Sequence, residues 1–205
     1  MAIGNRARRG TASVAVGATN ILPLSGSFNG VGYSIYGEPA PAPDNTPNAE
    51  ARAVTPEFFA ALDIPLLAGR LPDERDRADT ESVIVVSRTL AERQFGDMES
   101  ALGRALVRPD DTLRIVGVVG NVRHFTLDQA PEPALYMAES QAPSWMRTPF
   151  RLVVRVEEGR AALALLPQIR AIARELDPLM PVSRVHRMAE IAGDTYAAQR
   201  TRSLL

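Results

Sequence analysis

The sequence predicts an α+β fold in which a small domain is inserted into a larger one. Three observations lead to this prediction. Strand-like and helix-like segments alternate near the start of the chain, and a strand, a helix and a strand follow one another over its last third. The section between them has a strand, a helix and a hairpin of its own. The chain has 205 residues, of which 45% are hydrophobic, so it can fill a core of this size.

The first strand is predicted over Ser13–Ala18, because Thr11–Leu22 alternates and is rich in β-branched and small residues. The following segment, Pro23–Pro47, contains repeated prolines together with serine, glycine and asparagine. Proline can neither continue a helix nor donate a hydrogen bond within a sheet. We therefore expect a long irregular loop here, with a short edge strand at Tyr33–Tyr36.

A second strand, Glu50–Val54, leads into the start of a helix. Thr55 is the expected N-cap, Pro56 suits the first helical position, and Glu57 places an acidic group in the first turn. This helix is expected to bring three apolar side chains to one side and then to end near an Asp-Ile-Pro sequence: Phe58, Phe59 and Leu62, followed by Asp63–Pro65.

The next segment, Leu71–Glu81, is dense in opposed charges. Its carboxylates could ligate a metal ion, but no glycine stands where a calcium loop requires one. We therefore interpret the segment as a solvated connection between the two domains, and the sequence predicts neither a metal site nor a cofactor. The acidic residues considered are Asp73, Glu74, Asp76 and Asp79.

The middle section begins with a short apolar strand, Ser82–Val86. Ser87 is the expected cap of a helix that runs through Phe95, and Gly96 is expected to end that helix.

Two more strands, Ala101–Val107 and Leu113–Val119, are predicted to form a hairpin with its turn at Pro109–Asp111. Pro131–Pro149 is a further proline-rich loop, in which Leu135–Met137 is expected to form a short strand.

The last third predicts a split βαβ unit, with a strand over Arg151–Val156, a helix over Ala161–Leu176 and a strand over Val182–Val185. Pro167 belongs in the first turn of this helix or marks a kink. Thr195–Leu205 begins another helix without a stop signal, which indicates a piece of a longer protein. The expected buried face of the main helix consists of Leu165, Leu166, Ile169, Ile172 and Leu176.

The glycines of Gly117–Gly120 raise the question of a phosphate-binding loop. Such a loop needs a glycine-rich turn after a strand and directly before a helix. Here Gly117 lies inside the β-branched run Ile115–Val119, and prolines follow instead of a helix. We therefore expect these glycines to permit a β-bulge or close packing against a neighbouring element.

No catalytic residue is predicted. His124 and His186 are the only imidazoles, and neither a GxSxG nor an HExxH motif accompanies them, so we expect both on the surface. The absence of cysteine excludes thiol catalysis and cysteine-ligated metal. With 23 basic and 24 acidic residues the net charge is -1, which argues against a nucleic-acid partner.

Three residues are candidates for contact with a partner. Trp145 precedes the strand at Arg151 and either contacts a partner or covers the join between the two domains. Arg123 either grips an acidic ligand or pairs with a local carboxylate. Tyr36, in the first proline-rich loop, is the third candidate.

Six stretches resemble, in the same order, the extracytoplasmic core domain of MacB-like ABC transporter permeases. They are VTPEFFAALDIPLLAGRLPDERD, VIVVSRTLAERQFG, LGRALV, RIVGVVGNVRHFTLDQAPEPALYM, LVVRV and LDPLMPVSRVHRM. The resemblance extends from about Leu22 to Arg202 and is closest to the orphan, duplicated permeases of that family.

The resemblance implies a periplasmic domain of an inner-membrane protein, between the first and second transmembrane helices of a permease. It implies a porter-like split βαβ subdomain made from both chain ends, residues 1–75 and 147–195. A small β-rich subdomain, residues 76–146, would be inserted into it, and residues 196–205 would begin the helix that leads to a membrane span.

The resemblance also implies a non-catalytic role, in which the domain couples transmembrane-helix motion to export. The implied partners are an ABC-type ATPase reached through the membrane helices, a periplasmic adaptor or cargo, and a second permease protomer. Two alternatives remain open. One is a hydrolase that uses His124 or His186. The other is a module that binds a lipoprotein, peptide or lipid in an apolar cleft lined by Phe28, Tyr33, Tyr36 or Trp145.

Overall fold

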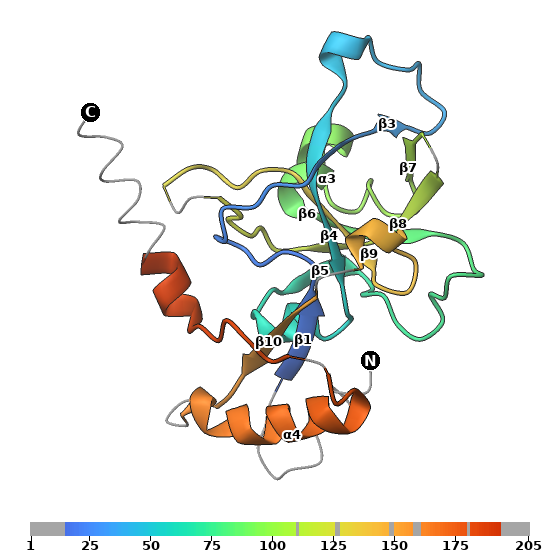
Figure 1. The fold of residues 1–205 in the computed structure, drawn as a ribbon. Helices are drawn as coiled ribbons and strands as arrows, with labels where there is room; N and C mark the ends of the chain where they lie inside the picture. Colours follow the sequence, from blue (N-terminus) through green and yellow to red (C-terminus); the bar gives the residue numbers. More distant parts are fainter. Residues whose placement is uncertain are drawn as a thin grey trace.

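The computed structural model describes residues 15–109, 111–125, 128–147, 150–157, 161–179 and 181–193. These residues form a mixed sheet of ten strands with short helices against it, so the predicted α+β class is confirmed (Figure 1). The strands are β1 (Ala15–Thr19), β2 (Gly30–Gly32), β3 (Ser34–Ile35), β4 (Asn48–Val54), β5 (Leu66–Gly69), β6 (Val83–Ser87), β7 (Ala105–Arg108), β8 (Asp111–Val119), β9 (Ala134–Ala138) and β10 (Arg151–Arg155). The helices are η1 (Pro43–Asn45), α2 (Phe58–Ala61), α3 (Arg88–Phe95), η2 (Ser144–Met146), η3 (Ala162–Leu165) and α4 (Leu166–Leu176), and residues 188–193 are also helical.

The strands follow the order β10-β1-β4-β9-β6-β8-β7-β3, with β2 also paired to β4 and β5 also paired to β8. The β4–β9 and β6–β8 pairs are parallel, and the other described pairs are antiparallel. Among the described residues, no helix combines the length and the apolar character that crossing a membrane requires.

The two faces of the central strands enter different apolar cores. Along β6, Ile84 and Val86 lie in one core and Val85 lies in the other, because successive side chains of a strand point to opposite faces. Leu90 of α3 belongs to the first core, and Phe58 of α2 belongs to the second. The sheet is therefore covered on both sides, which explains why β6 is a continuous apolar run.

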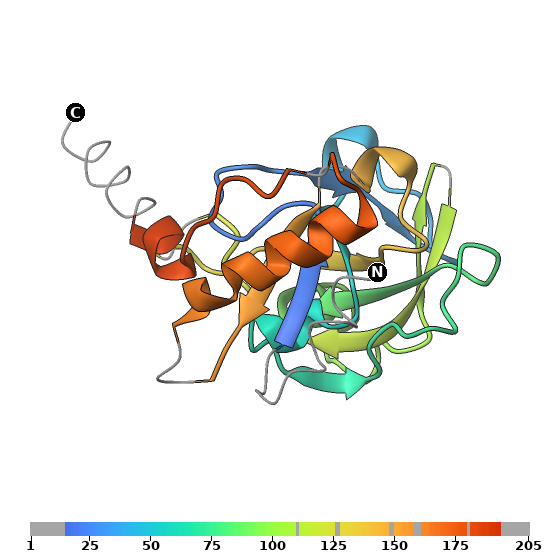
Figure 2. The ribbon, with the colours of Figure 1, turned by 60° about the horizontal axis from the view of Figure 1, so that its bottom comes forward.

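β1, β10 and α4 lie at one end of the sheet and are called here the end unit, while β2 to β9 are called the main sheet. β1 pairs with all five residues of β10, but its described register with the main sheet is the single pair Thr19↔Val54. α4 lies across β1 in Figure 2, and its buried side chains are Ile172 and Ala173. The end unit is thus joined to the main sheet by a narrow backbone contact.

Several predicted elements are confirmed. The hydroxyl of Ser87 accepts a hydrogen bond from the Leu90 N–H at the start of α3, and Gly96, with a φ of 85°, ends this helix. β7 and β8 pair as the expected antiparallel hairpin. Pro167 stands in the first turn of α4, after the 3-10 turn η3, as one of the two alternatives predicted.

Other local predictions are wrong. Residues 182–185 form no strand, because the irregular segment 181–187 has no ladder partner among the described residues. Residues 101–103 form a turn, and β7 begins only at Ala105. Thr55 does not cap α2, which has only four residues; its hydroxyl instead accepts a hydrogen bond from the Ala18 N–H of β1.

The buried face of α4 also differs from the prediction, because Leu176 is 41% exposed whereas Ala173 is buried. β2 and β5 were not predicted. The helix expected over Thr195–Leu205 lies outside the described residues.

Gly117 performs both structural roles expected of it. Ile84 of β6 pairs with Ile115, but the next residue, Val85, pairs with Gly117, so one residue of β8 bulges out of register. A Cβ atom at Gly117 would lie 2.1 Å from the carbonyl oxygen of Arg70. The glycine therefore lies next to a bulge at Val116 and at a point of close packing within a strand, and not in a turn before a helix.

A substitution at Gly17 tests the close packing of the β1 backbone against the α2 backbone. A Cβ atom at this position would lie 2.4 Å from the Cα atom of Phe58. We expect Gly17→Ala to lower the free energy of unfolding by about 1–3 kcal/mol, because the backbone of α2 cannot move aside without loss of packing. Chemical denaturation measures the change. Gly193→Ala is the control, because no atom of the described residues lies within 4 Å of its Cβ position, and equal stability of both variants would contradict the close approach.

Candidate functional site

Buried polar residues gather where the end unit meets the main sheet, in a region called here the joint. Thr19 and Asn20 lie at the end of β1, Glu50 and Arg52 lie on β4, and His124 follows β8. Each of the five is at least 93% buried, since the largest exposed fraction among them is 7%. Polar side chains are buried mainly where they have partners, so the bonds at the joint identify what it does.

The backbone contact at the joint consists of a few hydrogen bonds around Thr19 and Val54. The Asn20 N–H donates to the Ala53 carbonyl at 3.1 Å, and the Asn20 side-chain oxygen accepts from the Ala53 N–H at 3.0 Å. Arg151 of β10 donates to the carbonyl oxygen of Asn20. One asparagine therefore ties both strands of the end unit to β4.

A second tie lies on the other side of the Thr19–Val54 pair. The Thr55 N–H donates to the Ala18 carbonyl at 3.0 Å, and the Ala18 N–H donates to the Thr55 hydroxyl, also at 3.0 Å. The hydroxyl of Thr55 thus accepts the hydrogen bond of the Ala18 N–H in place of a backbone carbonyl of β4.

The centre of the joint is the fully buried guanidinium of Arg52. Its Nη1 atom lies 2.7 Å from Glu50 Oε1, and its Nη2 atom lies 3.3 Å from His124 Nδ1. Tyr136 of β9 is the cross-strand neighbour of Arg52, and its hydroxyl lies 3.2 Å from His124 Nε2. These contacts form a chain from Glu50 through Arg52 and His124 to Tyr136.

The protonation of this chain follows from its burial. Burial, followed by the charge of Arg52, lowers the pKa of His124 from 6.5 to about 3, so the imidazole is neutral. Arginine can only donate, so Nδ1 of His124 accepts and Nε2 carries the proton that it donates to Tyr136. Burial also raises the pKa of Glu50 and lowers that of Arg52, while the attraction within this pair acts against both shifts.

Residues 20–29, called here the cover loop, close over the joint. The Asn29 N–H lies 3.1 Å from both carboxylate oxygens of Glu50. The Leu24 N–H donates to the His124 carbonyl at 2.7 Å, and the rings of Phe28 and Phe125 lie 5.2 Å apart. The cover loop and the segment after β8 together exclude solvent from Arg52.

His124 corrects a prediction from the sequence. It was expected on the surface, but it is 1% exposed, because the chain after β8 folds back over Arg52 and Tyr136. His186 is exposed, as expected. The sequence did not reveal a role for Glu50 or Arg52, because alternating alanines and charged residues are also typical of a strand with one solvated face.

The three predicted partner contacts are all exposed. Tyr36 is 66% exposed beside β3, and Trp145 is 59% exposed on η2. No described hydrogen bond or ring contact joins these two side chains. Arg123 is exposed in the segment after β8. Tyr33, expected to line an apolar cleft, is instead 2% exposed within the first core, which weakens the ligand-binding alternative.

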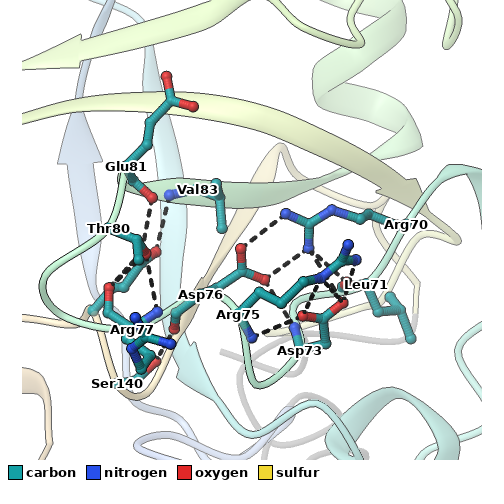
Figure 3. A network of polar contacts seen from close by, with 11 residues as sticks. Arg70, Leu71, Asp73, Arg75, Asp76, Arg77, Thr80, Glu81, Val83 and Ser140 are labelled. Atoms are coloured by element: carbon teal, nitrogen blue, oxygen red, sulfur yellow. Dashed lines mark hydrogen bonds and ion pairs between the residues drawn. The ribbon is translucent and has the colours of Figure 1, made fainter.

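The charged connection Leu71–Glu81 is fastened to the main sheet at two points. At the first, Asp76 is 5% exposed and accepts two hydrogen bonds from Arg70, at 2.7 and 2.8 Å (Figure 3). The Ser140 hydroxyl donates to the Asp76 carbonyl at 2.6 Å. The hydrogen bonds from Arg70 lower the pKa of Asp76, so this carboxylate remains ionised.

At the second point, the side chain of Gln141 replaces a missing strand partner. Its oxygen accepts from the Val83 N–H at 2.9 Å, and its amide group donates to the carbonyls of Arg77 and Glu81 at 3.0 and 2.8 Å. The connection is therefore fastened at these two points, while most of its residues are exposed, as expected of a solvated segment.

The family model described as "MacB-like periplasmic core domain" matches residues 10–172. The crystal structure of the periplasmic region of MacB from Actinobacillus actinomycetemcomitans is similar with a TM-score of 0.57 and 14% identity, over 85% of this chain and 72% of that one. A domain of a putative permease protein from Porphyromonas gingivalis is similar with a TM-score of 0.52 and 15% identity, over 82% and 65%. No curated protein matches.

The neutral state of His124 predicts acid sensitivity. Its folded-state pKa of about 3 lies below its usual 6.5, so the unfolded chain binds more protons between these values and stability falls as the pH is lowered. The expected slope from this residue is about 1.4 kcal/mol per pH unit. Unfolding at a series of pH values measures it. His124→Gln should remove that part of the slope, His186→Gln should leave it intact, and an unchanged slope in His124→Gln would contradict the assignment.

The fastening of the connection is tested by removing Asp76. Asp76→Ala leaves Arg70 without its bidentate partner, so we expect the free energy of unfolding to fall by about 1–3 kcal/mol. Asp79→Ala is the matched control, because Asp79 is 73% exposed and its ion pair with Arg77 is worth less than about 1 kcal/mol. Denaturation curves that show the same loss for both variants would mean that Asp76 does not fasten the connection.

Proposed function

This chain belongs to the family of MacB-like periplasmic core domains of ABC transporter permeases, and on that premise we propose that it relays movement of the transmembrane helices through the joint. It is a periplasmic domain. The proposed role is mechanical and non-catalytic: the domain couples helix motion to export and docks an adaptor or cargo. ATP hydrolysis would take place on a separate ABC-type ATPase, and a second permease protomer would face this one.

The observation that carries the proposal is the construction of the joint. The end unit contacts β4 through the single register pair Thr19↔Val54 and a small set of buried polar bonds. The central strands of the main sheet, in contrast, pair along several residues each. The short pairing between β1 and β4 is therefore where we place the movement between the two parts.

The position of the end unit along the chain also supports a relay of movement through the joint. β1 is the first described strand, and α4 lies in the last described third of the chain. If the domain lies between the first and second transmembrane helices, as the family resemblance implies, force from both helices reaches the end unit before the main sheet. Displacement of the end unit would then move the main sheet.

The subdomain division at residues 76 and 146 remains a proposal. In the division expected from the sequence, two rigid parts pivot at the charged connection. The bonds of Asp76 and Gln141 fasten that connection to the main sheet. We therefore place the pivot at the joint, and we keep Trp145, Arg123 and Tyr36 as proposed partner contacts.

Distance measurements by electron spin resonance test this proposal. Spin labels are placed at Gln168 on α4 and Glu92 on α3, both exposed, in the full permease with its membrane helices; the present chain has no cysteine that would compete for the label. We expect the distance between the labels to change by several ångström when ATP is added to the assembled transporter, because the end unit turns against the main sheet.

A second pair of labels, at Glu92 and Leu66, provides the matched control. Both residues are exposed on the main sheet but lie on opposite sides of the charged connection. We expect their distance to stay constant. A change in this control pair would place the pivot at the connection, and no change in either pair would contradict the relay of movement.

A further inference from the structure

An exposed arm rich in proline projects from the main sheet between β3 and β4. Residues 36–45, called here the proline arm, rise beyond the end of β4 at the top of Figure 1. Tyr36 is 66% exposed, and all residues from 37 to 45 are exposed except Pro41, which is half-buried. The arm lies away from both apolar cores, so its sequence is not explained by burial.

The arm contains three consecutive X-Pro dipeptides, Glu38-Pro39, Ala40-Pro41 and Ala42-Pro43. Proline fixes its own φ near -65°, and it restricts the preceding residue to the β and polyproline II regions. Ala42 has a φ of -60° and a ψ of 148°, which are polyproline II values. The sequence therefore sets the conformation of the arm without help from tertiary contacts.

One end of the arm is anchored to the main sheet. There the Tyr36 N–H donates to the Ala105 carbonyl at 2.9 Å, and Arg104 pairs with Glu38 at 3.0 Å. At the other end, the Asn45 N–H donates to the Ala42 carbonyl at 2.8 Å, which forms a turn within the arm before β4. These contacts and the prolines restrict the arm before any partner arrives, which reduces the entropy lost on binding.

The middle of the arm offers groups that a partner can use. No hydrogen bond among the described residues uses the backbone of Pro39, Ala40 or Pro41. Their carbonyl oxygens and two pyrrolidine rings are available together with the neighbouring ring of Tyr36. Proline rings in this conformation fit grooves lined by aromatic side chains, whose hydroxyl and indole N–H groups donate to the free carbonyls.

We propose that the proline arm is a docking surface for a protein partner that presents an aromatic-lined groove. Glu38 of the arm is already paired with Arg104, so Asp44 is the acidic residue that remains for a partner, and a basic residue on the rim of the groove would pair with it. This inference specifies the docking half of the proposed function and rests on it. It is tested on the chain alone, so its failure would leave the relay through the joint untouched.

The test is a nuclear magnetic resonance titration of the 15N-labelled chain with two probes that have such grooves, an isolated SH3 domain and an isolated WW domain. We expect at least one of them to cause saturable shifts confined to the arm, at the amides of Gly37, Ala40 and Ala42. In the double variant Pro39→Gly/Pro41→Gly, we expect binding to weaken at least ~10-fold, which corresponds to about 1.4 kcal/mol.

Pro181→Gly is the matched control, because Pro181 is also exposed but lies far from the arm in sequence, and it should bind like the original chain. The spectrum outside the arm reports whether each variant is folded, and Pro39→Ala/Pro41→Ala replaces the glycine variant if it is not. The proposal is overturned if neither probe shifts the amides of the arm. It is also overturned if the shifts persist in the variant that lacks Pro39 and Pro41. Arm shifts that arise when the chain alone is concentrated also overturn it, since the occupant is then a second copy.

Discussion

The burial of Arg52 is the constraint on which the arrangement around β4 depends. A guanidinium remains protonated under all ordinary conditions, so it can be buried only where acceptors surround it. Glu50 supplies the opposite charge, and the neutral His124 supplies a second acceptor. Loss of one partner from a buried ion pair typically costs about 3–5 kcal/mol, because the remaining charge is left without compensation. The cover loop and the segment after β8 must therefore stay closed over β4, although neither has regular secondary structure of its own.

This constraint separates the joint from the rest of the sheet. Elsewhere, apolar cores on both faces hold the strands, and such contacts do not depend on direction. At the joint, directional bonds of the side chains of Asn20 and Thr55 add to the packing of β1 and β10 against the second core. Directional bonds favour discrete arrangements over gradual deformation, and a discrete change of arrangement is what a domain needs in order to pass on the movement of membrane helices.

Local signals in the sequence predicted the elements that depend on local physics. The β-branched runs of β6 and β10, the Ser87 cap of α3 and the position of Pro167 in α4 were all found from neighbouring residues alone. The joint could not be found in this way. In β4, alanines alternate with Glu50 and Arg52, a pattern typical of a strand with one solvated face, and only tertiary contacts bury that face. The same contacts bury His124, whereas Val182 and Val185 have apolar strand character but pair with no strand in the part of the chain that the structure describes.

Native-state hydrogen exchange of the folded chain tests the central claim most directly. The amides of Asn20, Ala53 and Thr55 form the bonds across the joint, and the amides of Ile84 and Val86 lie in the centre of the main sheet. If the joint opens as a separate unit, its three amides will exchange together, with an opening free energy clearly below that of the β6 amides. A single opening free energy for all five amides would contradict the account, because the end unit and the main sheet would then unfold only as one body.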